Sequence, residues 1–158
     1  MSVIDQATFR TVLGHFPTGV TVIAGMDGEE PVGLAVGSFF SLSLDPPLVG
    51  FCVDKSSSSW SRMEGSGRFC VNILGADQED VCRAFAMSGD DKFAGIGWRP
   101  AESGSPLIDG VLAWIDCEVD ALHEGGDHHI VVGRVLGLDV GHEGDPLVFF
   151  RGGYANLR

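Results

Sequence analysis

The chain has 158 residues, 44% of them hydrophobic and 20% charged, and its formal net charge is −12 at pH 7. This length suits one domain, residues 1–158, with its own hydrophobic core, and the composition excludes a disordered chain. The negative charge argues against nucleic acid and anionic membranes as partners, and no apolar run reaches the roughly 20 residues of a membrane helix.

The first predicted element is an amphipathic helix that begins near Asp5 and ends before Pro17. The apolar residues with the i, i+3, i+4 and i+7 spacing of one helix face are Phe9, Val12, Leu13 and Phe16. We expect this face to pack against another apolar surface. The residues before it lack the basic region and apolar core of a secretory signal, so we expect a cytoplasmic protein.

Two strands joined by a turn come next. Residues 18–24 alternate between Thr and Val, residues 32–36 are mainly apolar, and Asp27-Gly28 between them is a turn signal. The two segments should therefore form a hairpin.

A third and a fourth strand are separated by two prolines. The alternation over residues 38–44 predicts a strand whose buried face carries Phe40, Leu42 and Leu44. The strand ends where two successive prolines remove two N–H donors, and residues 48–53 then read as a strand that is buried on both faces.

A run of serines follows the fourth strand. Lys55 precedes the serines at 56–59, where a short helix over residues 57–65 is predicted to begin. Backbone N–H groups, hydroxyls and one cation together suit a phosphate group. The alternative is a simple helix cap in a polar loop, although four serines exceed what a cap requires.

The rest of the chain is predicted to consist mainly of strands. In order, we expect a strand over 68–74, a helix over 78–87, a loop over 89–97, an extended connection over 98–110, strands over 111–122 and 130–140 joined by a polar turn over 123–128, and a last strand over 146–150. Within the first of these, Asn72 needs a hydrogen-bond partner if it is buried. Six to eight strands, mostly in hairpins, with two or three short helices, predict a mainly β fold: an antiparallel barrel with helices at its ends.

Few side chains are candidates for chemistry. His128 lies in a turn beside two glycines, where the backbone can approach a ligand, although many surface histidines have no role. Lys92 and Phe93 could contact one ligand together, or simply belong to a solvated loop. The four cysteines are widely spaced and are expected to be reduced core residues. Without a nucleophile motif or a phosphate-binding glycine motif, any chemistry must belong to a bound cofactor.

Seven motifs, which together cover nearly the whole chain, occur in the order and spacing of one family. They are Phe9-Arg10 with 14–22, Gly33 to Ser43, Leu44 to Val49, Ser66 to Leu74, Asp91-Lys92-Phe93, Gly126-Asp127-His128 and Arg151-Gly152-Gly153-Tyr154. In these motifs the chain resembles the short-chain flavin reductases, the reductase components of two-component flavin-dependent monooxygenases. Around Ala35, Lys55 and Trp60 it is most similar to the actinobacterial branch that serves oxygenases of steroid-ring breakdown.

The resemblance implies a fold, an activity and partners. The fold would be an FMN-binding split β-barrel with Greek-key-like connections. The protein would be a homodimer that reduces FMN, or FAD as the second choice, with NADH, or NADPH as the second choice. Reduced flavin would then pass to a separate monooxygenase.

The resemblance also implies site residues. The implied flavin-binding residues are Leu34, Ala35, Val36, Gly37, Ser38, Ser41, Leu42, Ser43, Cys52, Val53, Asp54, Lys55, Ser56, Ser57, Ser58, Phe85, Ala86, Lys92 and Phe93. The residues implied at the nicotinamide nucleotide are His128, Arg151, Gly152, Gly153 and Tyr154. His128 would orient the nicotinamide and is not required as an acid or base. Many family members carry polar residues where this chain has Ala35 and Gly37, so peptide groups would have to replace those hydrogen bonds.

Three alternatives stay open at this point. The chain could be a flavin store without reductase activity, a split-barrel relative that uses a deazaflavin or pyridoxal-type cofactor, or a dimeric scaffold with an empty barrel. A store would not need the 126–128 turn or the 151–154 segment.

Overall fold

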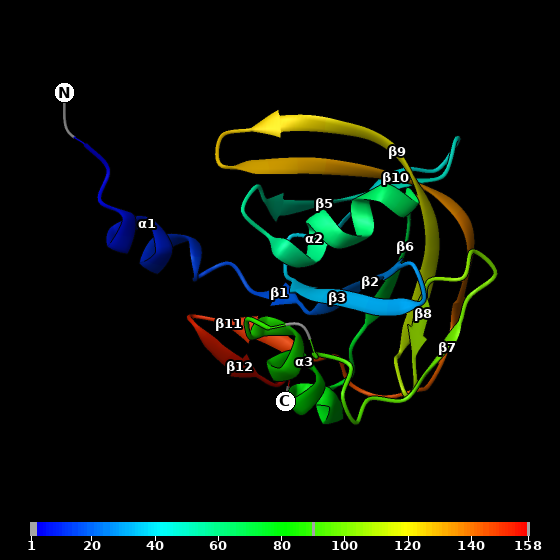
Figure 1. Ribbon diagram of the computed structural model, residues 1–158. Coiled ribbons are helices and arrows are strands. Elements are labelled where there is room, and N and C mark those ends of the chain that lie inside the picture. Colours follow the sequence, from blue (N-terminus) through cyan, green and yellow to red (C-terminus); the bar gives the residue numbers. More distant parts are fainter. Residues whose placement is uncertain (1–2, 90, 158) are drawn as a thin grey trace.

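The computed structural model describes residues 3–89 and 91–157, so Asp90 of the predicted loop lies outside the described residues. Seven antiparallel strands form the main sheet in the order β3-β2-β6-β9-β10-β5-β4 (Figure 1). Their bounds are β2 Thr21–Asp27, β3 Glu30–Val36, β4 Phe40–Ser43, β5 Leu48–Asp54, β6 Arg68–Ile73, β9 Ala113–Gly125 and β10 His128–Val140.

Smaller elements surround this sheet. Two further sheets consist of β1 Thr18–Gly19 with β11 Val148–Phe150 and β12 Gly153–Ala155, and of β7 Trp98–Pro100 with β8 Pro106–Ile108. The described α-helices are α1 Gln6–Leu13, α2 Ser58–Met63 and α3 Glu79–Ala86, with 3-10 turns at Glu64–Ser66 and Ala76–Gln78. The predicted class, a mainly β antiparallel barrel with short helices, is confirmed. No helix in the described chain is long and apolar enough to cross a membrane.

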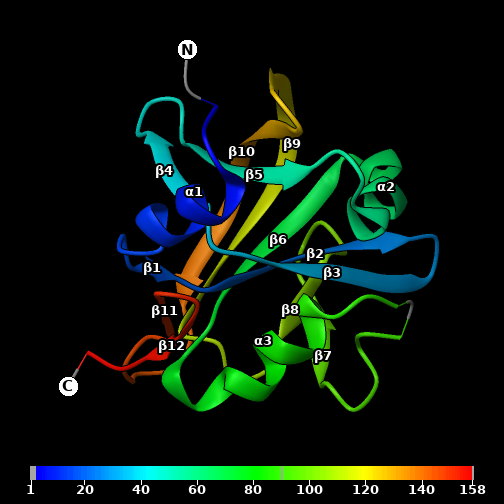
Figure 2. The ribbon, with the colours of Figure 1, turned by 90° about the vertical axis from the view of Figure 1, so that its left-hand side faces the viewer.

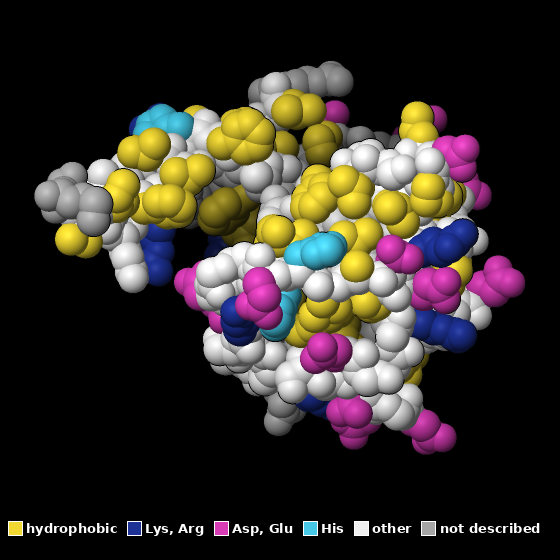
Figure 3. Space-filling view, turned by 90° about the horizontal axis from the view of Figure 1, so that it is seen from above, with side chains coloured by type: hydrophobic (Ala, Val, Ile, Leu, Met, Phe, Trp, Pro, Cys, Tyr) yellow, Lys and Arg dark blue, Asp and Glu magenta, His cyan; other side chains and the backbone are white. Residues whose placement is uncertain are grey.

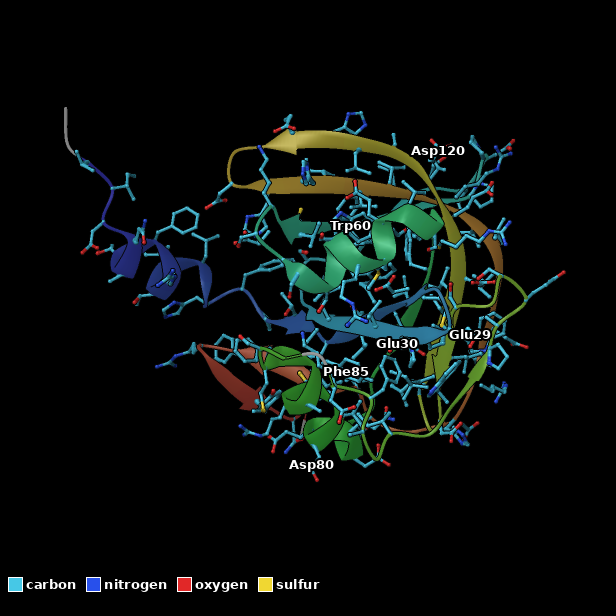
Figure 4. All side chains as sticks on the ribbon, in the orientation of Figure 1. Glu29, Glu30, Trp60, Asp80, Phe85 and Asp120 are labelled. Atoms are coloured by element: carbon cyan, nitrogen blue, oxygen red, sulfur yellow. The ribbon has the colours of Figure 1, made fainter. Side chains whose placement is uncertain are left out.

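Two apolar cores lie on the two faces of the β2–β3 hairpin. The inner core fills the barrel, where Phe51 meets Trp60 and Phe69 edge to face. The outer core lies beneath α3, and Figure 4 shows Trp60 and Phe85 on opposite sides of β3. Gly33 permits this contact, because a Cβ at that position would lie 2.8 Å from Cε1 of Phe85. The two helices therefore clamp β3 between them.

The β9–β10 hairpin is longer and tighter than the sequence predicted. Both strands have 13 residues, and only Gly126, with φ 68°, and Asp127 connect them. The predicted turn over 123–128 was too long because His123 and Glu124 pair with β10 despite their polarity. Register shifts at Val132/Gly133 and Val135/Gly137 bend the hairpin, so β9 reaches β6 while β10 reaches β5 (Figure 2).

The segment over 98–110, predicted as a connection, contains the β7–β8 hairpin. Its loop is fastened by Asp116, a carboxylate that is 1% exposed on β9. Asp116 accepts hydrogen bonds from the backbone N (3.0 Å) and Oγ (2.6 Å) of Ser103. This anchor is not visible from the local sequence pattern.

Two predicted apolar faces are not buried in the single chain. α1 stands apart from the barrel in Figure 1, and its stripe is exposed, with Phe16 75% exposed. On β4, Phe40 is half-buried but Leu42 is exposed, and so is Leu44 just after the strand. The predicted packing partner of α1 is therefore not found among the described residues of the single chain.

Asn72 has the partners that its burial demands. It is 0% exposed, its Oδ1 accepts from the backbone N of Ile108 (2.8 Å), and its Nδ2 donates to the carbonyl of Pro106 (3.2 Å). One amide side chain thus fastens β6 to β8.

We expect Asn72→Ala to lower the free energy of unfolding by about 2–4 kcal/mol, because it leaves buried peptide groups unpaired and opens a cavity. Chemical denaturation measures the loss. Asn156→Ala is the matched control, since Asn156 is exposed and should change stability by less than about 0.5 kcal/mol. Equal stability of the two variants would contradict this role of Asn72.

Candidate functional site

A cavity of about 540 Å³ opens where the ends of β3, β5, α2 and α3 meet. It is lined by residues 34–38, 52–54, 56–59 and 85–88 together with Lys92 and His128. β3 and β5 flank it, and no backbone ladder joins these two strands in the described chain. The site thus occupies the split in the barrel.

One wall of the cavity contains two residues with little or no side chain. Residues 34–38 continue from β3 and include Ala35 and Gly37. Gly37 lies close to Thr18, since a Cβ there would be 3.0 Å from the threonine Oγ1. A planar ligand can lie against such a wall because few side chains project from it.

His128 and Asp54 share one edge of the cavity. They are opposite each other in the β5–β10 register, so their side chains lie on the same face of the sheet. The Nδ1 atom of His128 is 2.7 Å from Oδ1 of Asp127, which leaves Nε2 as the ring nitrogen for a ligand. Hydrogen bonds from Ser56 lower the pKa of Asp54, and the nearby His128 lowers it further.

The serine run has divided roles. Ser56 binds Asp54 through its backbone N (2.8 Å) and its Oγ (2.7 Å), and Ser57 caps α2 by accepting from the backbone N of Trp60 (3.2 Å). Ser58 makes no hydrogen bond through its hydroxyl or its backbone N–H within the described chain, and the backbone N–H of Ser59 is likewise unbonded there. The donors left for a ligand are therefore those of Ser58 and Ser59.

Lys92 brings a cation to these donors. Its Nζ donates to Oγ of Ser59 (3.1 Å) and to the carbonyl of Phe85 (3.3 Å). Burial lowers the pKa of Lys92. An anion bound beside it would favour the charged form, so this corner of the cavity suits a phosphate.

Lys55, the lysine that the sequence placed at a phosphate, lies outside the cavity lining. Its ammonium group pairs with Glu124 on β9, and this contact lowers the pKa of the carboxylate. Its backbone N donates to the carbonyl of Asp127 (3.0 Å). Lys55 therefore fastens the loop before α2 to the tip of the β9–β10 hairpin.

Other predicted site residues also lie outside the lining. Ser41, Leu42 and Ser43 belong to the edge strand β4. Phe93 packs behind Phe85, with ring centroids 4.8 Å apart, and so supports the wall.

The 151–154 segment forms the turn between β11 and β12 and does not reach this cavity in the single chain. Tyr154 donates through its hydroxyl to Sγ of Cys82 (3.2 Å), a contact that together with burial raises the pKa of Tyr154 to about 12. Arg151 lies with its guanidinium 5.6 Å from the ring centroid of Phe150. Of the residues predicted at the nicotinamide nucleotide, His128 lines the cavity, whereas residues 151–154 do not.

The sequence did not identify Ser59, Met87 and Ser88, which also line the cavity. Ser59 belongs to the serine run and could have been included on that ground. Met87 and Ser88 follow the end of α3, and their composition carries no signal.

The chemistry of the site suits an anionic ligand, whereas the cysteines and possible metal ligands concern the described chain as a whole. Cys70, Cys82 and Cys117 are buried, Cys52 is half-buried, and all four are unpaired, as predicted. Burial raises the pKa of Cys117 to about 12, so this thiol is not nucleophilic at neutral pH. The described residues include no group of three or more side chains that could hold a metal ion.

Comparison with known proteins gives a consistent result. Residues 13–158 match the model of the flavin reductase like domain. The chain is 53% identical over 156 residues to the reductase subunit HsaB of a flavin-dependent monooxygenase from Mycobacterium tuberculosis, covering 98% of this chain and 83% of that protein.

Solved structures agree. The crystal structure of nitrilotriacetate monooxygenase component B from Mycobacterium thermoresistibile has 54% identity and a TM-score of 0.95, covering 98% of this chain and 87% of that one. The NADH:FAD oxidoreductase SgcE6 of Streptomyces globisporus, in complex with NAD and FAD fragments, has 37% identity and a TM-score of 0.92, covering 100% and 98%. The resemblance to flavin reductases, including the predicted branch, is confirmed.

Proposed function

Because the chain belongs to the family of flavin reductase like domains, we propose that it is an NADH-dependent flavin reductase that supplies reduced flavin to a separate monooxygenase. The observation that carries this proposal is the cavity. It gathers in one place most of the residues that the sequence assigned to a flavin, from three distant segments of the chain.

The residues present fit a flavin mononucleotide. The wall over residues 34–38, with its small residues Ala35 and Gly37, suits the isoalloxazine ring, and Phe85 packs against Gly33 beside this wall. The unbonded donors of Ser58 and Ser59 and the ammonium of Lys92 suit one terminal phosphate. We favour FMN over FAD on this ground.

A bound flavin supplies the hydride acceptor for NADH, and the protein has to align the two ring systems. His128 projects from the hairpin end into the cavity, with Asp127 holding its Nδ1. We assign His128 the orientation of the nicotinamide. The step needs no acid or base from the protein.

We also propose a homodimer. The exposed stripe of α1 faces an apolar groove of about 700 Å³ that is lined from Leu13 and Phe16 on one side to Phe39, Phe40 and Ile73 on the other. Figure 3 shows apolar side chains along α1 and across the hollow beside it. A second copy would bury these groups.

Residues 1–158 are proposed to act as one domain, since α2, α3 and the strands share the two cores. A cytoplasmic location is proposed as well, because NADH and the receiving monooxygenase must be available together.

The reductase proposal predicts that the purified protein oxidises NADH only when FMN or FAD is added, with a lower KM for FMN. Absorbance of NADH at neutral pH measures this. His128→Ala should mainly raise the KM for NADH. Binding of flavin without NADH oxidation would instead support a flavin store. NADH oxidation that neither requires nor is accompanied by flavin binding would reject both the flavin reductase and the flavin store.

The phosphate proposal predicts that Lys92→Met raises the Kd for FMN roughly 10–100-fold, the effect of one charge-assisted hydrogen bond. Fluorescence titration measures the Kd. Lys55→Met, a matched control, should change it less than about threefold, since Lys55 pairs with Glu124.

Riboflavin, which lacks the phosphate, should bind both lysine variants and the wild type alike. Affinity for FMN should fall as the pH rises toward the lowered pKa of Lys92, because the neutral amine no longer attracts phosphate. Equal effects of Lys92→Met on riboflavin and FMN would contradict the phosphate role.

The dimer proposal predicts that the wild type sediments as two chains and that Phe16→Asp raises the dissociation constant at least about tenfold, by placing a charge in the apolar contact. Leu157→Asp is the control, since Leu157 is also exposed but lies away from the groove. A wild type that sediments as one chain at micromolar concentration would refute the dimer.

A further inference from the structure

The ladder between β4 and β5 is continued by a side chain after its backbone pairs end. Phe40 pairs with Gly50 and Ser41 with Val49, so in the same antiparallel register Ser38 stands opposite Cys52. At this position Oγ of Ser38 accepts from the backbone N of Cys52 (2.9 Å) and donates to its carbonyl (3.0 Å). One hydroxyl therefore takes both hydrogen bonds that a backbone partner would make.

Because the hydroxyl takes the place of a backbone partner, the backbone groups of Ser38 are left without these hydrogen bonds. Within the described chain, neither the N–H nor the C=O of Ser38 or Gly37 makes a hydrogen bond. Both residues line the cavity.

The wall that contains Ser38 has space on both sides. Gly37 and Ser38 line the flavin cavity, and they also line the groove beside α1. In the described chain, the two Ser38 hydrogen bonds are the polar link between this wall and Cys52. Without them, residues 37–38 are held through their neighbours, Val36 in the β2–β3 ladder and Phe40 in the β4–β5 ladder, and can shift relative to Cys52.

On the basis of the proposed function, we propose that Ser38 is a positioning residue of the flavin site. Its hydroxyl ties the wall to β5 and is thereby occupied, while the peptide groups of residues 37–38 stay free for the flavin. The pyrimidine edge of the isoalloxazine ring carries carbonyl oxygens and an N–H, which are the partners that free peptide groups require. Ser38 thus acts on the cofactor through the backbone that it holds in place.

The test compares Ser38→Ala, Ser38→Thr and Ser61→Ala. Ser61 is exposed on α2 away from the cavity and controls for the loss of a serine hydroxyl. Two quantities are measured: hydrogen exchange of the Cys52 amide in flavin-free protein, followed by NMR, and the Kd for FMN. Ser38→Ala should accelerate this exchange at least about tenfold and raise the Kd about tenfold, whereas Ser38→Thr, which retains a hydroxyl, and Ser61→Ala should stay within about threefold of wild type in both.

Each result decides the matter. Weaker FMN binding with unchanged exchange at Cys52 would make the hydroxyl a direct flavin ligand and overturn the inference. Faster exchange with unchanged FMN binding would show a purely structural bond and overturn it as well. If Ser38→Ala does not fold, Ser38→Thr provides the test. If this variant protects the Cys52 amide as the wild type does but binds FMN more weakly than the wild type, Ser38 is not a positioning residue. Absence of flavin-dependent NADH oxidation in the wild type overturns the proposed function, whereas loss of the Ser38 effect alone overturns only this inference.

Discussion

The whole site depends on two strands that face each other without forming a ladder. β3 and β5 lie on either side of the split, and the polar groups at their ends have to find other partners. On β5 the hydroxyl of Ser38 serves Cys52, while α2 closes the barrel with Trp60 and Met63. The hydroxyl of Ser38 thus takes the hydrogen bonds of Cys52, while α2 contributes apolar packing, and the gap between the strands is available to a planar ligand.

Because the protein is negatively charged, the proposed phosphate site must attract its ligand through nearby groups. With a net charge of −12, the surface as a whole repels an anionic cofactor, so binding relies on short-range groups. Lys55 is already neutralised by Glu124, whereas Lys92 contacts neutral partners, a hydroxyl and a carbonyl. Burial makes the charge on Lys92 unfavourable, and a phosphate beside it compensates that cost. Lys92, whose charged form is disfavoured by burial in the free protein, is thus better suited to the phosphate than Lys55.

Local patterns predicted the elements well, and long-range pairing explains where they failed. The β2–β3 hairpin, the buried Asn72 and the α3 stripe follow from alternation, polarity and helical spacing. Most of the cavity lining was also predicted, through motifs. The partner of Lys55 was not, because Glu124 is distant in sequence and becomes a neighbour only through the β9–β10 hairpin. The same holds for Asp116 and Ser103, whereas the apolar faces on α1 and β4 stay exposed in the described chain.

The proposed flavin cavity and the proposed dimer groove share the wall formed by Gly37 and Ser38. Gly37 and Ser38 separate the cavity from the groove beside α1, so whatever fills the groove also limits the movement of the wall. A second copy seated on α1 would support the side of the wall opposite the flavin, while Ser38 restrains its edge at β5. The exposed apolar stripe, which is unfavourable in a single chain, then becomes part of the support for the site. Flavin affinity and self-association should therefore be coupled, because both draw on the position of the same two residues.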